Sequence, residues 1–417
     1  MKKVITYGTY DLLHYGHVKL LERAKALGDY LIVGITSDAY DMTRGKINNQ
    51  QSLMERIAAV EALGIADQII VEEYEGQKID DIKRFAVDIF TVGSDWKGQF
   101  DYLNDICQVV YLDRTEGVSS SEIRTEKRKI KIKVEGSAAI GNKFINESKY
   151  VNGVQIVDTN DETAMYLVSS PQKHYSQIKE ALCEGKHVLC ESPLALNRAE
   201  CDELFSIANE NNCILMEGIK TAYSTAYARL VLLAKSGKIG SILSIDATCT
   251  SMKYTGNESE NQWNSISAWG PTALLPIFQI LGTDYLHKSI CTRMVDSSTM
   301  YDGFTKIDFV YPNAVASIKV AKEAKSEGDL IITGTEGYIY VPAPWWKTDY
   351  FEVRYENMSE NKRYFYQLDG EGIRYEIIAF ARAIENGKAD FYIDTNVSKA
   401  ICGVVEDYYN NVDVYHI

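Results

Sequence analysis

The sequence has 417 residues, of which 46% are hydrophobic and 24% charged, an ordinary composition for a globular protein. This length exceeds what one hydrophobic core usually supports, so two or three domains are expected. The formal net charge of −14 argues against nonspecific binding of nucleic acid, and any nucleotide is expected in a local basic pocket.

The start of the chain carries no charged-then-apolar export segment, and no apolar run approaches the length of a membrane span. The eight cysteines form no C-x-x-C pair. Free thiols in a reducing compartment are the expected state, which predicts a cytoplasmic protein.

Strand and helix patterns alternate through the first 112 residues. Helical patterns cover 17–27, 51–62 and 78–85, between strand patterns at 3–7, 30–35, 68–71, 87–92 and 107–112. Such alternation predicts a parallel sheet wound on both faces. Ligands of these sheets lie beyond the carboxyl ends of the strands, where the strand order reverses.

Residues 8–17, Gly-Thr-Tyr-Asp-Leu-Leu-His-Tyr-Gly-His, join the first strand to the first helix. The start of a helix presents backbone N–H groups and a positive dipole end to an anion. His14 and His17 stand there, and Gly16 between them allows close approach of a ligand. A lone histidine at a helix start is more often a cap, but two of the six histidines fall in this window. The segment therefore predicts a phosphate site.

Two other segments supply polar donors. Residues 43–46, Thr-Arg-Gly-Lys, follow the second strand, and residues 114–121, Arg-Thr-Glu-Gly-Val-Ser-Ser-Ser, follow the fifth. The first of these could equally be a solvated surface loop. Lys78 by itself would be a cation at a helix start, and Trp96 and Asp95 could serve packing and a turn.

Residues 1–125 resemble the glycerol-3-phosphate cytidylyltransferases of the HxGH nucleotidyltransferase superfamily. The resemblance is carried by residues 7–17, 20–25, 93–101 and 110–117. The His-x-Gly-His motif alone indicates nucleotidyl transfer. The tryptophan-containing loop and the Arg-Thr-Glu-Gly segment favour cytidylyl transfer to a small phosphorylated alcohol.

The resemblance implies a role for each matching residue. The implied catalytic residues are His14, His17, Lys46 and Arg114. The implied nucleotide-binding residues are Gly8, Thr9, Tyr10, Asp11, Gly16, Arg56, Asp95, Thr115, Gly117, Ser119, Ser120 and Ser121. Acceptor binding is implied for Arg44, Lys78 and Trp96. The acceptor phosphate would attack the α-phosphorus of CTP, and a divalent ion, expected to be Mg²⁺, would bridge the triphosphate. No protein side chain is predicted as a metal ligand.

After a charged linker at 124–129, residues 131–141 resemble a strand followed by a dinucleotide-binding glycine turn. Ala138 stands where the middle glycine would let the backbone meet a pyrophosphate. From Thr163 onward the chain resembles the Gfo/Idh/MocA oxidoreductases, which carry a Rossmann domain and a C-terminal α+β domain. The matching segments are 164–171, 174–175, 181–195, 216–218, 238–240 and 331–337.

Three departures from that family argue against dehydrogenase activity. Ser192 replaces the lysine of Glu-Lys-Pro, Pro276 an aspartate, and Ile280 a histidine or tyrosine, so no proton donor remains there. Strands near 153–158 and 164–169 are also joined by about five residues, fewer than a parallel crossover needs. We expect a truncated Rossmann-like segment, and NAD(P) is an unlikely cofactor.

The rest of the chain indicates packed structure. Helices are expected near 198–211, 224–236 and 373–386. Strands near 241–251, 305–321, 329–341 and 350–367 predict a large antiparallel sheet. Such a sheet commonly joins subunits in the resembled family, which implies a homo-oligomer.

These observations predict an α/β protein with a Rossmann-like, doubly wound nucleotidyltransferase sheet, then the truncated segment and an α+β domain with the large antiparallel sheet. The expected domains are 1–128, 129–220 and 221–417. The expected reaction converts CTP and glycerol 3-phosphate to CDP-glycerol and pyrophosphate, supplying a teichoic-acid-like or capsular polymer. The alternatives are another acceptor such as phosphoethanolamine, a bifunctional enzyme with an NAD(P)-dependent second half, and an interaction protein without either activity.

Overall fold

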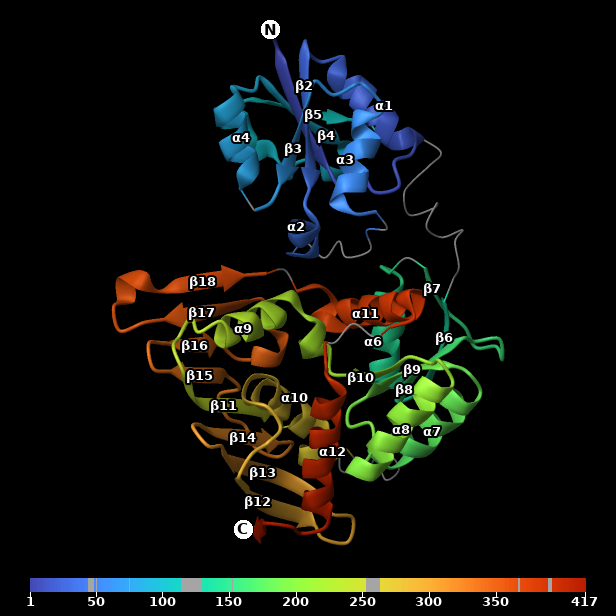
Figure 1. Cartoon of the computed structure of the whole chain (residues 1–417), viewed down its shortest axis with the longest axis vertical. Coiled ribbons are helices and arrows are strands. Elements are labelled where there is room, and N and C mark those ends of the chain that lie inside the picture. The colour runs from blue at the N-terminus through green and yellow to red at the C-terminus, as the bar shows by residue number, and fades with distance from the viewer. Residues whose placement is uncertain are drawn as a thin grey trace. The chain divides into compact units, whose positions relative to one another are not determined.

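The computed structural model describes residues 1–43, 49, 51–74, 76–113, 130–151, 153–252, 263–366, 368–388 and 392–417. The chain forms two compact units, Met1–Lys129 and Ile130–Ile417, called here the first and second unit (Figure 1). Within the described residues, no helix has both the length and the apolar character that crossing a bilayer requires.

The first unit is a five-stranded parallel sheet in the order β3-β2-β1-β4-β5. Its strands are β1 (Lys3–Gly8), β2 (Tyr30–Thr36), β3 (Gln68–Glu72), β4 (Ile89–Gly93) and β5 (Gln108–Leu112). Its helices are α1 (Tyr15–Lys25), α2 (Asp38–Thr43), α3 (Leu53–Glu61) and α4 (Gln77–Phe85), with 3₁₀ turns η1 (Ser94–Trp96) and η2 (Asp101–Asp105). The predicted doubly wound sheet is confirmed.

Apolar side chains on both faces of this sheet explain the winding. Leu21 of α1 and Val60 of α3 pack with Val4 on one face. Ile82 of α4 packs with Ile5 on the other, so neighbouring residues of β1 face opposite layers (Figure 1). The central strand β1 is buried from Val4 to Tyr7, as expected of a parallel sheet that is covered on both faces.

The second unit begins with another parallel sheet, in the order β10-β9-β8-β6-β7. Its strands are β6 (Ile130–Gly136), β7 (Val154–Ile156), β8 (Ala164–Val168), β9 (His187–Glu191) and β10 (Leu215–Gly218). Its helices are α6 (Ala138–Ser148), α7 (Pro171–Cys183) and α8 (Arg198–Glu210). This sheet confirms the Rossmann-like segment.

The connection from β7 to β8 is short because of where these strands lie in the sheet, and not because a crossover is missing. The two strands do not pair with each other but lie on opposite sides of β6. Ile156 ends β7 opposite Ile132, and Ala164 begins β8 opposite the same residue. Residues 157–163 therefore only have to cross β6, without running back along it, and no helix or strand lies among them. The expectation that these strands need a full crossover is wrong.

A nine-stranded sheet completes the second unit, in the order β18-β17-β16-β15-β11-β14-β13-β12-β19. The strands are β11 (Ile242–Thr250), β12 (His287–Asp296), β13 (Tyr301–Val310), β14 (Val315–Ala321), β15 (Leu330–Gly334), β16 (Tyr338–Val341), β17 (Tyr350–Arg354), β18 (Lys362–Phe365) and β19 (Val414–His416). The sheet is antiparallel except at two parallel pairs, β11 with β14 and β12 with β19, so it is mixed rather than wholly antiparallel.

Helices cover this sheet and connect it to the Rossmann-like part. They are α9 (Thr225–Lys235), α10 (Ser265–Leu281), α11 (Ile373–Asn386) and α12 (Thr395–Tyr409), with 3₁₀ turns η3 (Lys220–Tyr223), η4 (Trp345–Lys347), η5 (Met358–Glu360) and η6 (Asp369–Gly372). Helix α10 packs on β11, β13 and β14, while α11 packs on α6 and α12 on α8.

Candidate active site

The loop from β1 to α1 lies at the point where the order of the first sheet reverses. Strand β1 pairs with β2 on one side and with β4 on the other, and the chain winds outward in both directions from it. Residues 9–14 leave the carboxyl end of β1 there. This is the position at which open parallel sheets bind ligands.

The two histidines of this loop lie against each other. Their ring centroids are 3.9 Å apart and the ring planes differ by 21°. His14 caps α1, because its Nδ1 accepts a hydrogen bond of 3.1 Å from the Gly16 N–H. A neutral imidazole whose Nδ1 accepts carries its proton on Nε2, so His14 Nε2 is a donor. With no acidic residue in the first turn of α1, the site suits an anion.

The loop holds a strained backbone conformation. Tyr10 and Leu12 have φ values of 53° and 48°, in the left-handed region that non-glycine residues rarely occupy. Tyr10 is only 2% exposed, and its ring meets His17 edge-on at 5.5 Å. A Cβ at Gly8 would stand 2.9 Å from the Tyr10 ring, so glycine is required there. The buried Tyr10 ring is therefore packed against the His17 ring.

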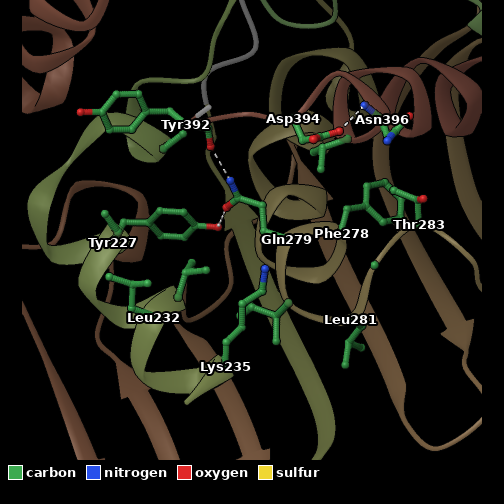
Figure 2. A pocket seen from close by; sticks show the side chains of 16 residues that line it. Tyr227, Leu232, Lys235, Phe278, Gln279, Leu281, Thr283, Tyr392, Asp394 and Asn396 are labelled. Carbon is green, nitrogen blue, oxygen red and sulfur yellow. Dashed lines mark hydrogen bonds between the residues drawn. The ribbon is translucent and has the colours of Figure 1, made fainter. Parts of the chain in front are cut away.

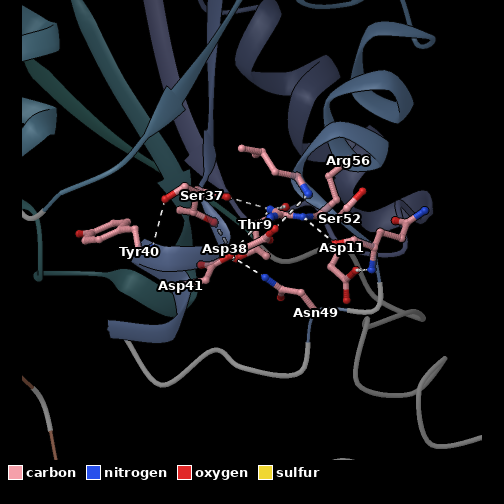
Figure 3. A network of polar contacts seen from close by, with 12 residues as sticks. Thr9, Asp11, Ser37, Asp38, Tyr40, Asp41, Asn49, Ser52 and Arg56 are labelled. Atoms are coloured by element: carbon pink, nitrogen blue, oxygen red, sulfur yellow. Dashed lines mark hydrogen bonds and ion pairs between the residues drawn. The ribbon is translucent and has the colours of Figure 1, made fainter. Parts of the chain in front are cut away.

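Arg56 ties this loop to the neighbouring strand from inside the protein. Its side chain is fully buried, and Nη1 donates to the Thr9 carbonyl at 2.8 Å and to the Thr36 carbonyl at 2.9 Å. Nε donates to the Gln51 carbonyl at 3.2 Å. Figure 3 shows Arg56 together with Thr9, Asp38 and Asp41 in one polar network. The structure therefore places Arg56 behind the loop, as a positioning residue.

Acidic side chains complete the network in Figure 3. Arg56 pairs with Asp38 and lies 3.7 Å from Asp41, which is fully buried. Asp41 also accepts from the Thr9 hydroxyl at 3.2 Å and from Asn49 at 2.8 Å. Asp38 and Asp41 follow the end of β2, and this position directly after a strand was the sequence signal that could have identified them.

Replacing Arg56 tests its structural role. Arg56→Leu leaves the buried Asp41 without its cation, which is expected to lower the free energy of unfolding by about 3–5 kcal/mol. Arg84→Leu is the matched control, because Arg84 is exposed on α4 and its loss should change stability by less than about 0.5 kcal/mol. Urea unfolding of both variants measures the difference. Equal stability of the two variants would contradict the role.

The two described acceptor candidates lie near one aromatic ring. Lys78 Nζ is 5.7 Å from the ring centroid of Phe100, and the Trp96 ring is 5.9 Å from the same residue. Lys78 is 7% exposed, pairs with Glu72 at the end of β3, and lies 4.8 Å from the Tyr7 ring. The charge of Lys78 is thus already balanced by Glu72, a partner that the sequence pattern did not identify.

The polar network beneath Lys78 extends into α4. Tyr7 donates to Asp81 at 2.9 Å, and Gln77 donates to the same carboxylate at 3.1 Å. Burial, followed by the charge of Asp81, raises the pKa of Tyr7 well above its usual value. Tyr7 therefore stays a neutral donor that fixes α4 against β1.

Other predicted site residues lie outside the described residues: Arg44, Lys46, Arg114, Thr115, Gly117, Ser119, Ser120 and Ser121. Asp95 lies within η1, next to Trp96. The roles of all these residues remain predictions.

The corresponding edge of the second sheet keeps only part of a dinucleotide site. Gly136 has φ 123° and a Cβ there would meet Val168 backbone at 2.3 Å, and a Cβ at Gly141 would meet Val134 at 3.0 Å. These two glycines thus retain the tight turn and the helix–strand packing of the motif. Ala138 stands at the middle position, where the motif has the glycine that lets a pyrophosphate approach the backbone.

The structure also shows the surroundings of Ser192 and Ile280, two of the residues that differ from the dehydrogenase pattern. Ser192 is buried and donates to Glu217 rather than lying open to a substrate. Ile280 lines a cavity of about 750 Å³ between α9, the end of α10 and the start of α12 (Figure 2). There Gln279 accepts from Tyr227 at 2.8 Å and donates to the Tyr392 carbonyl at 2.6 Å. Ile280 itself contributes only an alkyl side chain to this cavity.

Buried carboxyl groups lie on the α6 side of this second sheet. Glu376 of α11 is 1% exposed, and burial followed by the charge of Glu191 raises its pKa well above 4.5, against the effect of Lys220. Glu191 accepts from the Tyr166 hydroxyl at 2.5 Å, and burial raises its pKa also. Burial, followed by the charge of Glu376, raises the pKa of the Tyr223 hydroxyl. Glu376 therefore keeps its proton at pH values where an unfolded glutamate has lost it.

This shift predicts a pH-dependent stability. Above pH 4.5 the unfolded state releases the Glu376 proton while the folded state retains it, so the wild-type free energy of unfolding falls as pH rises. Glutamine does not titrate, so the Glu376→Gln variant lacks this pH-dependent fall. The free energy of unfolding of the variant minus that of the wild type should therefore increase from pH 5 to pH 8. Glu360→Gln, at an exposed residue of η5, is the control. Thermal unfolding across this range measures the effect, and a difference independent of pH would refute it.

Fold and site together define a nucleotidyltransferase of the His-x-Gly-His type. The profile of cytidylyltransferase-like proteins matches residues 5–126, and that of the oxidoreductase family with an NAD-binding Rossmann fold matches residues 130–219. The chain is 48% identical over 126 residues to glycerol-3-phosphate cytidylyltransferase of Bacillus spizizenii, covering 30% of this chain and 97% of that protein. The Bacillus subtilis enzyme of the same name is 50% identical over 126 residues, with the same coverage. The chain belongs to the cytidylyltransferase family through its first unit.

Solved structures similar to the chain are oxidoreductases. A 3-ketoreductase from Actinomadura kijaniata, determined with NADP and TDP-benzene, is 16% identical with a TM-score of 0.59, covering 70% of this chain and all of that one. An oxidoreductase from Agrobacterium radiobacter, determined with NAD+, L-tartaric acid and magnesium, is 14% identical with a TM-score of 0.58, covering 68% of this chain and 96% of that one. These likenesses establish the fold, and the predicted fusion is confirmed.

Proposed function

We propose that the protein transfers CMP from CTP to glycerol 3-phosphate, giving CDP-glycerol and pyrophosphate. The observation that supports this proposal most directly is the stacked His14–His17 pair. It lies at the start of α1, where the strand order of the first sheet reverses. The glycerol-3-phosphate cytidylyltransferases named above align with nearly their whole length to this unit. The product would supply a teichoic-acid-like or capsular polymer, and the substrates would be met in the cytoplasm.

In the proposed reaction an oxygen of the acceptor phosphate attacks the α-phosphorus of CTP. A bond forms between these atoms, the bond from the α-phosphorus to the bridging oxygen breaks, and pyrophosphate leaves with the electron pair. The acceptor phosphate is largely ionised at neutral pH, so no general base is needed. His14 Nε2, His17 and the start of α1 stabilise the charge that develops on the phosphate oxygens.

The remaining predicted residues have supporting roles in this proposal. Lys46 and Arg114 offset the charge of the leaving pyrophosphate, and Arg44, Lys78 and Trp96 bind the acceptor in this proposal. Among the described residues, no three His, Cys, Asp or Glu side chains converge to hold a metal. This donor set fits Mg²⁺ held chiefly by the triphosphate, where the ion would neutralise phosphate charge.

Loss of one histidine tests the site. His17→Ala removes a donor to the phosphates and is expected to lower the rate of pyrophosphate release from CTP and glycerol 3-phosphate by about 100- to 1000-fold. Lys19→Ala, on the same helix and paired with Glu22, is the control and should keep the wild-type rate. Wild-type turnover by His17→Ala would remove the site assignment.

A panel of phosphorylated alcohols, including phosphoethanolamine, with CTP or ATP identifies the acceptor and the nucleotide.

For the second unit we propose a non-catalytic role without NAD(P), in which the nine-stranded sheet joins subunits of a homo-oligomer. Ala138 at the middle glycine position and the buried Ser192 support the non-catalytic role without NAD(P). Aromatic and charged side chains on the face away from α10 support the second, since Arg354 lies 4.7 Å from the Tyr340 ring and pairs with Glu352.

Both parts can be measured on one preparation of the full chain. NADH emission should stay unchanged on addition of the protein at concentrations up to about 100 μM, because the glycine turn lacks the pyrophosphate approach. Light scattering should report a mass of at least two chains. Enhanced NADH emission would revive the bifunctional alternative, and a monomer would exclude the role in assembly.

A further inference from the structure

Gln51 binds two consecutive residues of the loop from β1 to α1. Its side-chain Oε1 accepts a hydrogen bond of 2.8 Å from the Leu12 N–H, and its own backbone N–H donates to Asp11 Oδ1 at 3.0 Å. Gln51 lies 39 residues further along the chain than Leu12 and directly precedes Ser52, the N-cap of α3. These two bonds therefore connect the loop that carries the histidines to the start of a second helix.

Gln51 is itself held in place by α3. Arg56 Nε donates to the Gln51 carbonyl oxygen at 3.2 Å. The Ser52 N–H donates to the Glu55 carboxylate at 2.7 Å, as part of a capping box that fixes the first turn of the helix. The backbone N–H, the carbonyl and the side-chain oxygen of Gln51 are thus all engaged, and its position is determined by a buried guanidinium and a capped helix.

The segment that Gln51 binds is the strained part of the loop. Leu12 has a φ of 48°, a conformation that a leucine keeps only where its surroundings impose it, and Asp11 is 1% exposed. The bond to Gln51 fixes the peptide group before the N–Cα bond of Leu12, while α1 fixes the chain that follows. Together they impose this φ value. His14 lies two residues beyond Leu12, so a relaxed φ would displace its ring from the His17 ring, whose centroid is 3.9 Å away.

We propose that Gln51 is a positioning residue of the transferase site, which holds the turn at Leu12 so that both histidines present their donors to one phosphate chain. This inference rests on the proposed function. The buried guanidinium holds the loop at the Thr9 carbonyl, and Gln51 holds it three residues further along. Gln51 can act on the rate without touching a substrate, because stabilisation of a developing charge requires donors that are already in place. Its neutral amide adds no negative charge that would repel the phosphates.

The variant Gln51→Met tests this role in a pyrophosphate-release assay of the full chain with CTP and glycerol 3-phosphate. Methionine has a similar length but only a weak acceptor, so kcat should fall about tenfold, as expected for the loss of one hydrogen bond. The KM for CTP should stay within about twofold of the wild type, because the bond affects the placement of donors to the transition state. Gln108→Met, at the exposed start of β5 and away from the carboxyl ends of the strands, is the control and should change neither constant.

A second substitution tests whether Gln51 acts through the strained turn. Asparagine adopts the left-handed conformation more readily than leucine. Gln51→Met should therefore lower kcat by only about threefold in a Leu12→Asn background, and an equal loss in both backgrounds would overturn this mechanism.

Thermal unfolding separates positioning from stability. If Gln51 served stability alone, Gln51→Met would lower the melting temperature but keep the wild-type kcat well below that temperature, and this result would overturn the inference without affecting the proposed function. Absence of turnover in the wild type would refute the proposed function and this inference with it.

Discussion

Two hydrogen bonds from a buried guanidinium to backbone carbonyls hold the loop that carries the two histidines. Arg56 joins the carbonyl of Thr9, just after β1, to that of Thr36 at the end of β2. Each of these carbonyls lies at or just beyond the end of a strand, where backbone groups need a partner inside the protein. The cost of burying the charge is offset by Asp38 and Asp41. This fixed frame allows Tyr10 and Leu12 to hold their left-handed conformations and so brings His14 and His17 into contact.

This arrangement explains why a loop can supply preorganised donors. Stabilisation of a developing charge requires groups that are already in place, since reorienting them during the reaction consumes the gain. His14 caps α1 and His17 lies in the first turn of that helix, and the His14 ring is fixed further by the hydrogen bond from the Gly16 N–H. Rigidity at the site therefore comes from residues behind the loop, which do not themselves need to touch a substrate.

The sequence predicted much of this unit because its signals are local. Alternating strands and helices, and the His-x-Gly-His spacing after β1, sufficed for the parallel sheet and for the proximity of the two histidines. The role of Arg56 and the pairing of Lys78 with Glu72 depend on contacts between segments distant in sequence, which periodicity does not encode. The same holds for β7 and β8. The short connection between these strands was predicted from the sequence. The pairing of both strands with β6 at Ile132 could not be predicted from that length.

Packing alone explains the two retained glycines of the turn in the second unit. Gly136 and Gly141 remain because a Cβ would strike β8 or Val134, which is a packing constraint independent of any cofactor. The middle position has no such constraint, and alanine is tolerated there at the start of α6. The fold thus requires these two glycines whether or not a dinucleotide binds. A glycine motif of this kind therefore indicates the fold more directly than it indicates a cofactor.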